Sequence, residues 1–138
     1  MKLAVERVLK RLGMRPIILN EQVNGGDTIF DKFEKNTNVG FAVVLLSPDD
    51  VGYEKSNPKE PRPRARQNVI LELGYLTGKL GRSRVCVLKN GGDLEIPTDI
   101  LGVAYESYDQ PNGMWQLRLA QELRHAGYEV DSNKLTGG

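Results

Sequence analysis

Residues 39–46 read VGFAVVLL, and this stretch decides the fold class. Every residue from Phe41 to Leu46 is apolar, which is typical of a strand that is covered on both faces. A second run of this kind, RVCVL, occupies residues 84–88. Strands buried on both faces occur in parallel sheets with helices on each side, so the two runs predict an α/β domain.

Helical and extended patterns alternate along the rest of the chain. We predict helices over 2–12, 65–80 and 113–126, a short helix after residue 27, and further strands over 16–19 and 103–108. The resulting fold is a parallel sheet with helices on both faces. A chain of this class usually opens with a strand, but this one opens with a helix. We therefore expect the first strand of the sheet to be missing from this chain.

Two polar segments lie outside this alternation. Residues 51–64 contain three prolines and are long for a connection, which indicates a functional or disordered segment. Residues 129–138 end in Gly-Gly and are interpreted as a polar tail or linker. One domain of ordinary size, residues 1–128, accounts for the rest of the 138-residue chain.

Composition excludes several classes of function. Lys and Arg number 19 against 18 Asp and Glu, a net charge of +1, which argues against a nucleic-acid polymer or a membrane surface as partner. Cys86 and His125 are the single cysteine and histidine, so neither an internal disulfide nor a Cys/His metal site is expected. We expect Cys86 to be an inert core residue and His125 to lie on the surface. No apolar run approaches the roughly 18 residues of a membrane span, so the cytoplasm is the default location.

Glu72 is the most informative polar residue. In the predicted helix 65–80, it falls at the edge of the apolar stripe, and Asn68 and Tyr75 share its side at i−4 and i+3. A carboxylate there is partly desolvated yet reachable from a cleft. On the pattern alone, an exposed glutamate on a helix flank is the favoured interpretation, because glutamate is rarely buried.

Polar residues at two other places can be interpreted either as ligand-binding residues or as ordinary turn and loop residues. Ser47 and Asp49 follow the strand 39–46, and ligands of open α/β sheets bind beyond the carboxyl ends of strands, but the same residues form an ordinary turn. Arg66, with Arg62 and Arg64, can meet phosphates or form a solvated basic loop.

Asn24, Gly25 and Gly26 precede the short helix predicted after residue 27. The N–H groups at its start can receive a phosphate, although Gly-Gly before a helix is also common turn chemistry. Neither GxGxxG nor GxxxxGK[ST] occurs in the chain, so the usual nucleotide-binding loops are absent.

The stretch ARQNVILELGY at residues 65–75 carries a family resemblance, together with GFAVVLLSPDD at 40–50, RVCVL at 84–88 and EQVNGG at 21–26. Over residues 2–127 the chain resembles the bacterial TIR-like domain of CD-NTase-associated and Pycsar effector proteins. The resemblance implies a flavodoxin-like TIR fold and hydrolysis of NAD⁺ at the nicotinamide–ribose bond, with Glu72 as the catalytic residue. NAD⁺ is then the substrate, and no cofactor is implied.

The same resemblance implies a role in anti-phage defence, in which NAD⁺ depletion follows detection of a cyclic nucleotide by a sensor domain outside this chain. Residues 20–27 correspond to the TIR loop that governs self-association, so activation implies a homo-oligomer. The substrate contacts expected from the residues and the resemblance together are Asn24, Gly25, Gly26, Ser47, Asp49, Arg66, Asn68 and Tyr75. Two alternatives stay open: an enzyme like the nucleoside deoxyribosyltransferases, which also uses a helix-borne glutamate, and a non-catalytic TIR-like self-association module, which needs no Glu72.

Overall fold

The structure, a computed structural model, describes residues 1–17, 29–35, 38–91, 94–96, 103–108 and 113–135. Three parallel strands form its central sheet in the order β1-β4-β5. They are β1 (Ala42–Leu46), β4 (Val85–Lys89) and β5 (Ala104–Ser107). Leu45 of β1 lies opposite Leu88 of β4, and Val87 lies opposite Tyr105 of β5. The predicted parallel α/β sheet is thereby confirmed.

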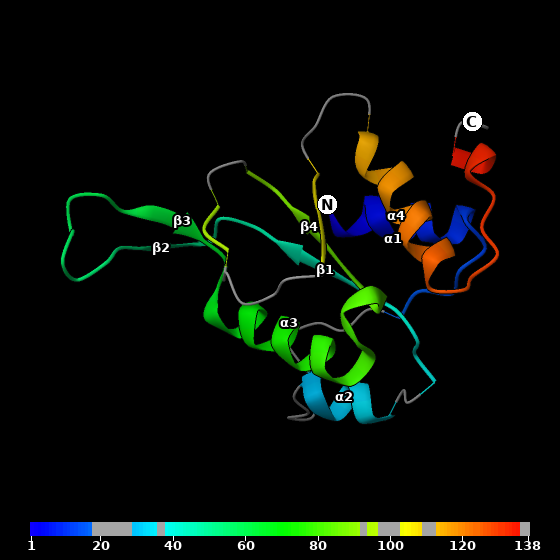
Figure 1. Cartoon of the computed structure of the whole chain (residues 1–138), viewed down its shortest axis with the longest axis horizontal. Helices are drawn as coiled ribbons and strands as arrows, with labels where there is room; N and C mark the ends of the chain where they lie inside the picture. Colours follow the sequence, from blue (N-terminus) through cyan, green and yellow to red (C-terminus); the bar gives the residue numbers. More distant parts are fainter. Residues whose placement is uncertain (18–28, 36–37, 92–93, 97–102, 109–112, 136–138) are drawn as a thin grey trace.

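Helices cover both faces of this sheet (Figure 1). On one face, α1 (Lys2–Arg11) and α4 (Met114–His125) bury Val5, Val8, Leu119 and Leu123 against it. On the other face lie α2 (Ile29–Lys35) and α3 (Gln67–Leu80), whose buried side chains include Phe33, Leu73 and Leu76. Residues 85–88 of β4 are buried throughout, as a strand covered on both sides must be.

Local chemistry sets the ends of the helices. In α1 the basic Lys10 and Arg11 occupy the last turn, where they complement the helix dipole, and Gly13 follows with a φ of 85°. Gly81 follows α3 with a φ of 92°, in the left-handed region that favours glycine. The predicted helices 2–12 and 65–80 are observed as α1 and α3, and each observed end lies within two residues of the predicted one.

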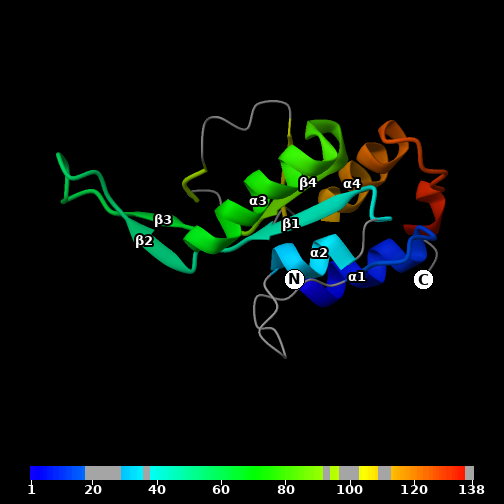
Figure 2. The same cartoon turned by 90° about the horizontal axis from the view of Figure 1, so that it is seen from below.

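The polar segment between β1 and α3 forms an arm, so the prediction that it is disordered is wrong, whereas a function for it stays a prediction. Short strands β2 (Asp50–Gly52) and β3 (Arg62–Arg64) pair in antiparallel fashion and extend away from the body of the domain in both views (Figures 1 and 2). The arm is fastened at its base, where the backbone N–H of Glu95 donates to the carbonyl oxygen of Pro63 at 2.8 Å. Residues 51–64 are therefore structured in part, although nothing in their sequence alternates as a strand does.

Two further predictions need correction. Pro16 and Ile17 form no strand, and Ile17 is 45% exposed, so the predicted buried strand does not begin there; residues 18–19 lie outside the described residues. In the predicted tail, a short 3₁₀ turn spans Ser132–Leu135, and Val130 and Leu135 pack against the core. Apolar side chains at these two positions explain why this part of the segment docks on the domain.

Among the described residues, β1 forms one edge of the sheet, because no described strand pairs with its side opposite β4. The prediction of a missing first strand concerns this position. No helix in the described ranges is long and apolar enough to cross a lipid bilayer.

Candidate active site

Helix α3 carries the central candidate, Glu72. Its neighbour Leu73 is 1% exposed and points into the core, whereas Leu71 on the other side is 59% exposed. Glu72 lies between these extremes and is half-buried. The helix thus presents this carboxylate at the boundary between core and solvent, as the helical period predicted, where water screens it only in part.

Asn68 and Tyr75 lie on the Glu72 side of the helix, one turn before and one turn after it. Asn68 is exposed and Tyr75 is half-buried. The hydroxyl of Tyr75 donates a hydrogen bond to Oε1 of Glu34 on α2 at 2.5 Å. This hydrogen bond, with desolvation and the charge of Glu34, raises the pKa of Tyr75 to about 12. In this structure the hydroxyl of Tyr75 is thus directed to α2.

The carboxyl end of β1 meets the start of α3. Ser47 follows the last strand residue and is half-buried, and its carbonyl oxygen accepts a hydrogen bond from the backbone N–H of Asp49 at 2.8 Å. Oδ2 of Asp49 lies 3.8 Å from Nε of Arg66, the residue at the N-cap of α3. Both side chains are about half exposed, so this ion pair contributes little to stability, but it brings two predicted ligand contacts together.

The other arginines of the basic segment do not join this pair. Arg64 turns back toward the base of the arm, where its Nη2 donates to Oε2 of Glu95 at 3.3 Å. Arg62 is exposed on β3. Asn24, Gly25 and Gly26 lie outside the described residues, so their predicted contacts with a phosphate stay a prediction.

Sequence reasoning missed Glu34. It lies on a seven-residue helix, 41 positions before Tyr75, and its Oε1 also lies 3.2 Å from Nζ of Lys79. The hydrogen bond from Tyr75, followed by the contact with Lys79, lowers the pKa of Glu34. The sequence signal was the pair of aromatic residues Phe30 and Phe33 on the same short helix, which indicates a packed helix but not its partner.

Neither the cysteine nor the histidine has the surroundings of a catalytic group. Cys86 is 0% exposed in the middle of β4, and burial raises the pKa of its thiol to about 12, so the thiol stays protonated at neutral pH. His125 is exposed in the last turn of α4. Within the described ranges, no cluster of three or more His, Cys, Asp or Glu side chains could hold a metal ion. The predicted positions are confirmed, with Cys86 in the core and His125 on the surface.

The fold and the site thus define the class of the protein: a parallel α/β domain with a glutamate on helix α3 at the boundary between core and solvent. Residues 1–110 match the family model "CAP12/Pycsar effector protein, TIR domain". This match covers most of the chain, and the chain belongs to that family.

The chain is also similar to proteins from three organisms. The chain is 46% identical over 132 residues to "Uncharacterized protein YuaY" of Escherichia coli (strain K12), covering 95% of this chain and 43% of that protein. It is 36% identical over 115 residues to "Protein tirC" of Dictyostelium discoideum, covering 77% of this chain and 57% of that protein. Over 69 residues it is 36% identical to "Pycsar effector protein PaPycTIR" of Pseudomonas aeruginosa, covering 49% of this chain and 21% of that protein. The chain therefore spans about half the length of the first two relatives.

Proposed function

We propose that this chain is the catalytic TIR domain of a defence effector and that it hydrolyses NAD⁺ at the bond between nicotinamide and ribose. The observation that carries the proposal is the position of Glu72 within the family stretch ARQNVILELGY. Its side chain is half-buried at the edge of the core of α3, beside a helix face that also presents Asn68. A carboxylate at such a boundary position is suited to stabilise developing positive charge.

One carboxylate suffices for this reaction. Glycosidases commonly use a second carboxyl group as an acid, because the departing oxygen must be protonated. In NAD⁺ the nicotinamide ring is already cationic, so when its bond to C1′ of the ribose breaks, both electrons move to the ring nitrogen and nicotinamide leaves neutral. Water supplies the oxygen that bonds to C1′ and releases one proton. Glu72 stabilises the oxocarbenium-like ribose or attacks it, and the absence of a usable histidine is no obstacle.

The predicted substrate contacts fit these parts of NAD⁺. We assign Ser47 and Asn68 to the ribose hydroxyls, and Arg66, next to Asp49 at the start of α3, to the diphosphate. Asn24, Gly25 and Gly26 are proposed to complete the site from the segment before α2. NAD⁺ is the substrate in this scheme, so neither a cofactor nor a metal ion takes part.

The setting of the reaction is part of the same proposal. The family and the relatives named as Pycsar effectors support a role in a cyclic-nucleotide-sensing defence system. We further propose that the domain acts in the cytoplasm, forms a homo-oligomer on activation and responds to a sensor outside this chain.

Nicotinamide release by the purified chain, measured across a range of protein concentrations, tests the proposal. We expect Glu72→Gln to lower the rate at least about 100-fold, the loss typical when a charge-stabilising group is removed from an active site, while the circular dichroism spectrum stays unchanged. Glu6→Gln is the matched control, because Glu6 is also a half-buried helical glutamate and forms an ion pair with Lys10 on α1. Nicotinamide release by Glu72→Gln at the wild-type rate would overturn the role of Glu72. A wild-type chain that assembles but releases no nicotinamide would favour the self-association module.

A further inference from the structure

Helix α2 needs an anchor, because it has only seven residues and helices of that length are not stable alone in water. The structure provides one anchor in the core and one at the surface. Phe33 is 7% exposed and packs in the same cluster as Leu73 and Leu76 of α3. The surface anchor is centred on Tyr75.

Tyr75 contacts α2 through its ring and its hydroxyl. Its ring centroid lies 4.6 Å from that of Phe30 at an interplanar angle of 60°, and 5.6 Å from that of Phe33 at 87°. Offset and edge-on arrangements of this kind are the favourable ones for aromatic pairs. The hydroxyl at the end of the same ring donates to Oε1 of Glu34 at 2.5 Å. The Tyr75 side chain of α3 therefore contacts both aromatic residues of α2 through its ring and Glu34 through its hydroxyl.

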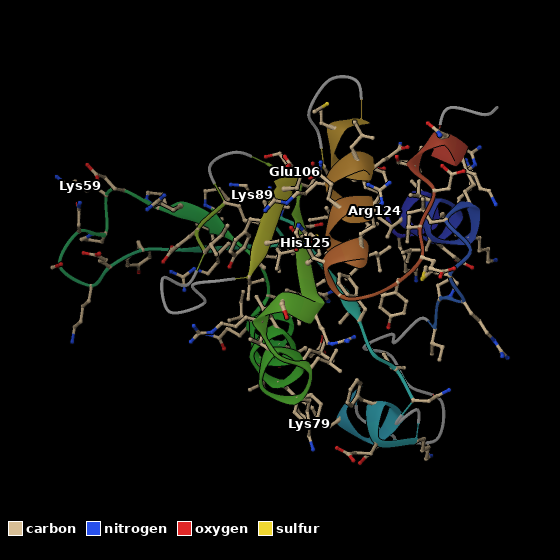
Figure 3. The ribbon with its side chains drawn as sticks, turned by 45° about the vertical axis from the view of Figure 1, so that its right-hand side comes forward. Lys59, Lys79, Lys89, Glu106, Arg124 and His125 are labelled. Atoms are coloured by element: carbon tan, nitrogen blue, oxygen red, sulfur yellow. The ribbon has the colours of Figure 1, made fainter. Side chains whose placement is uncertain are left out.

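Lys79 completes the surface anchor. Its Nζ lies 3.2 Å from Oε1 of Glu34 and 5.7 Å from the centroid of the Tyr75 ring. Figure 3 shows Lys79 on the flank of α3 next to α2. Each of these exposed contacts is weak by itself, but three groups that share partners act as a unit and restrain one another.

Tyr75 and Glu72 lie one turn apart on the same side of α3. We propose that Tyr75 and Glu34 form a positioning pair, which fixes α2 on the helix that carries Glu72 and thereby sets the orientation of the Glu72 side of that helix. The pair has no chemical part in the reaction. This inference rests on the proposed function, and it gives Tyr75 a role different from direct contact with the substrate.

The experiment compares Tyr75→Phe, which keeps the ring and removes the hydroxyl, with Glu34→Ala and Glu34→Gln. The glutamine keeps an acceptor for Tyr75, so it serves as the conservative rescue. Glu6→Gln is the control for loss of a helical glutamate that forms an ion pair, because Glu6 lies 3.1 Å from Lys10 on α1. Three readouts are taken: amide hydrogen exchange in residues 29–35, the ¹³C signal of the Glu72 carboxyl group, and kcat and KM for nicotinamide release.

We expect Tyr75→Phe and Glu34→Ala each to speed exchange in α2, to shift the Glu72 carboxyl signal, and to lower kcat about tenfold with KM nearly unchanged, since small misplacements of reacting groups cost rate. The kcat of the double variant Tyr75→Phe/Glu34→Ala should be no lower than that of Glu34→Ala alone. The kcat of Glu34→Gln should be close to that of the wild type. A rise in KM at constant kcat would instead make Tyr75 a substrate contact and overturn the inference. Wild-type kcat in Tyr75→Phe and Glu34→Ala would overturn it as well.

Two of the readouts do not need activity, so failure of the proposed function is recognisable separately. If the wild-type chain releases no nicotinamide, the proposed function fails, while faster exchange in α2 and a shifted Glu72 signal in Tyr75→Phe still support the positioning pair. Unchanged exchange and an unchanged Glu72 signal in that variant overturn the pair whatever the activity.

Discussion

The guanidinium group of Arg64 on β3 lies directly against the backbone of Gly52 on β2, in the space where any other residue would place its Cβ atom. From that position Arg64 also reaches Glu95, whose Oε2 lies 3.3 Å from its Nη2. Glu95 in turn donates its backbone N–H to Pro63 on β3. One arginine therefore joins both strands of the arm to the body of the domain, and it can do so only because residue 52 has no side chain.

Substituting Gly52 with alanine tests this attachment. The added methyl group displaces the guanidinium, which is the flexible end of a long side chain, so the whole domain should lose no more than about 1 kcal/mol of unfolding free energy. The local effect is larger: we expect amide exchange to speed up in residues 50–52 and 62–64 and at Glu95. Arg64→Ala should reproduce this pattern, because it removes the same contacts. Protection of the arm that is unchanged in both variants would contradict the attachment.

The carboxyl group of Glu34 offers a test of the α2–α3 contact by pH. The hydrogen bond from Tyr75 is the largest cause of its lowered pKa, and Lys79 is the second. The contribution of the ionised group to stability is present above its ordinary pKa of 4.5 and is lost as the pH falls through the lowered pKa. An NMR titration should show that Tyr75→Phe raises the pKa of Glu34 toward its ordinary value more than Lys79→Gln does. The reverse order would show that the ion pair, and not the hydrogen bond, dominates.

Cys86 should be unreactive in the folded chain. Its side chain is 0% exposed in β4, and burial raises the pKa of the thiol to about 12. We expect no labelling by a thiol reagent at mildly alkaline pH under native conditions and complete labelling in denaturant. Cys86→Ala should leave nicotinamide release unchanged, whereas Cys86→Ser places a hydroxyl in the core and should cost about 1–3 kcal/mol of unfolding free energy. Rapid labelling of the native chain would contradict the buried position.

How far the sequence predicts this fold differs from element to element. The strands β1 and β4 and helix α1 were predictable, because a buried parallel strand and an amphipathic helix each leave a pattern in consecutive residues. The arm shows no such pattern in its sequence, because its two strands have only three residues each and β3 contains Pro63. The base of the arm is held by Glu95, which is distant from it in the sequence.

The sequence likewise predicts only a part of the candidate site. The boundary position of Glu72 follows from the helical period alone, but its chemistry could be assigned only by family resemblance, because an exposed flank glutamate gives the same pattern. The contact between Tyr75 and Glu34 depends on how α2 docks on α3, and their separation of 41 residues leaves no local signal.

The glycines of α3 provide a last prediction, with a control in the same helix. Gly78 lies in the interior of α3, it is exposed, and a Cβ there would meet nothing within 4 Å. Alanine at this position restricts the unfolded chain and should raise the free energy of unfolding by about 0.5–1 kcal/mol. Gly81 also has open space around it, but its φ of 92° lies in the left-handed region, so Gly81→Ala should lower the free energy by a similar amount or more. Urea unfolding of both variants measures the difference. Because space is available at both positions, opposite signs would show that backbone conformation decides the outcome, and equal signs would contradict the helix end at Gly81.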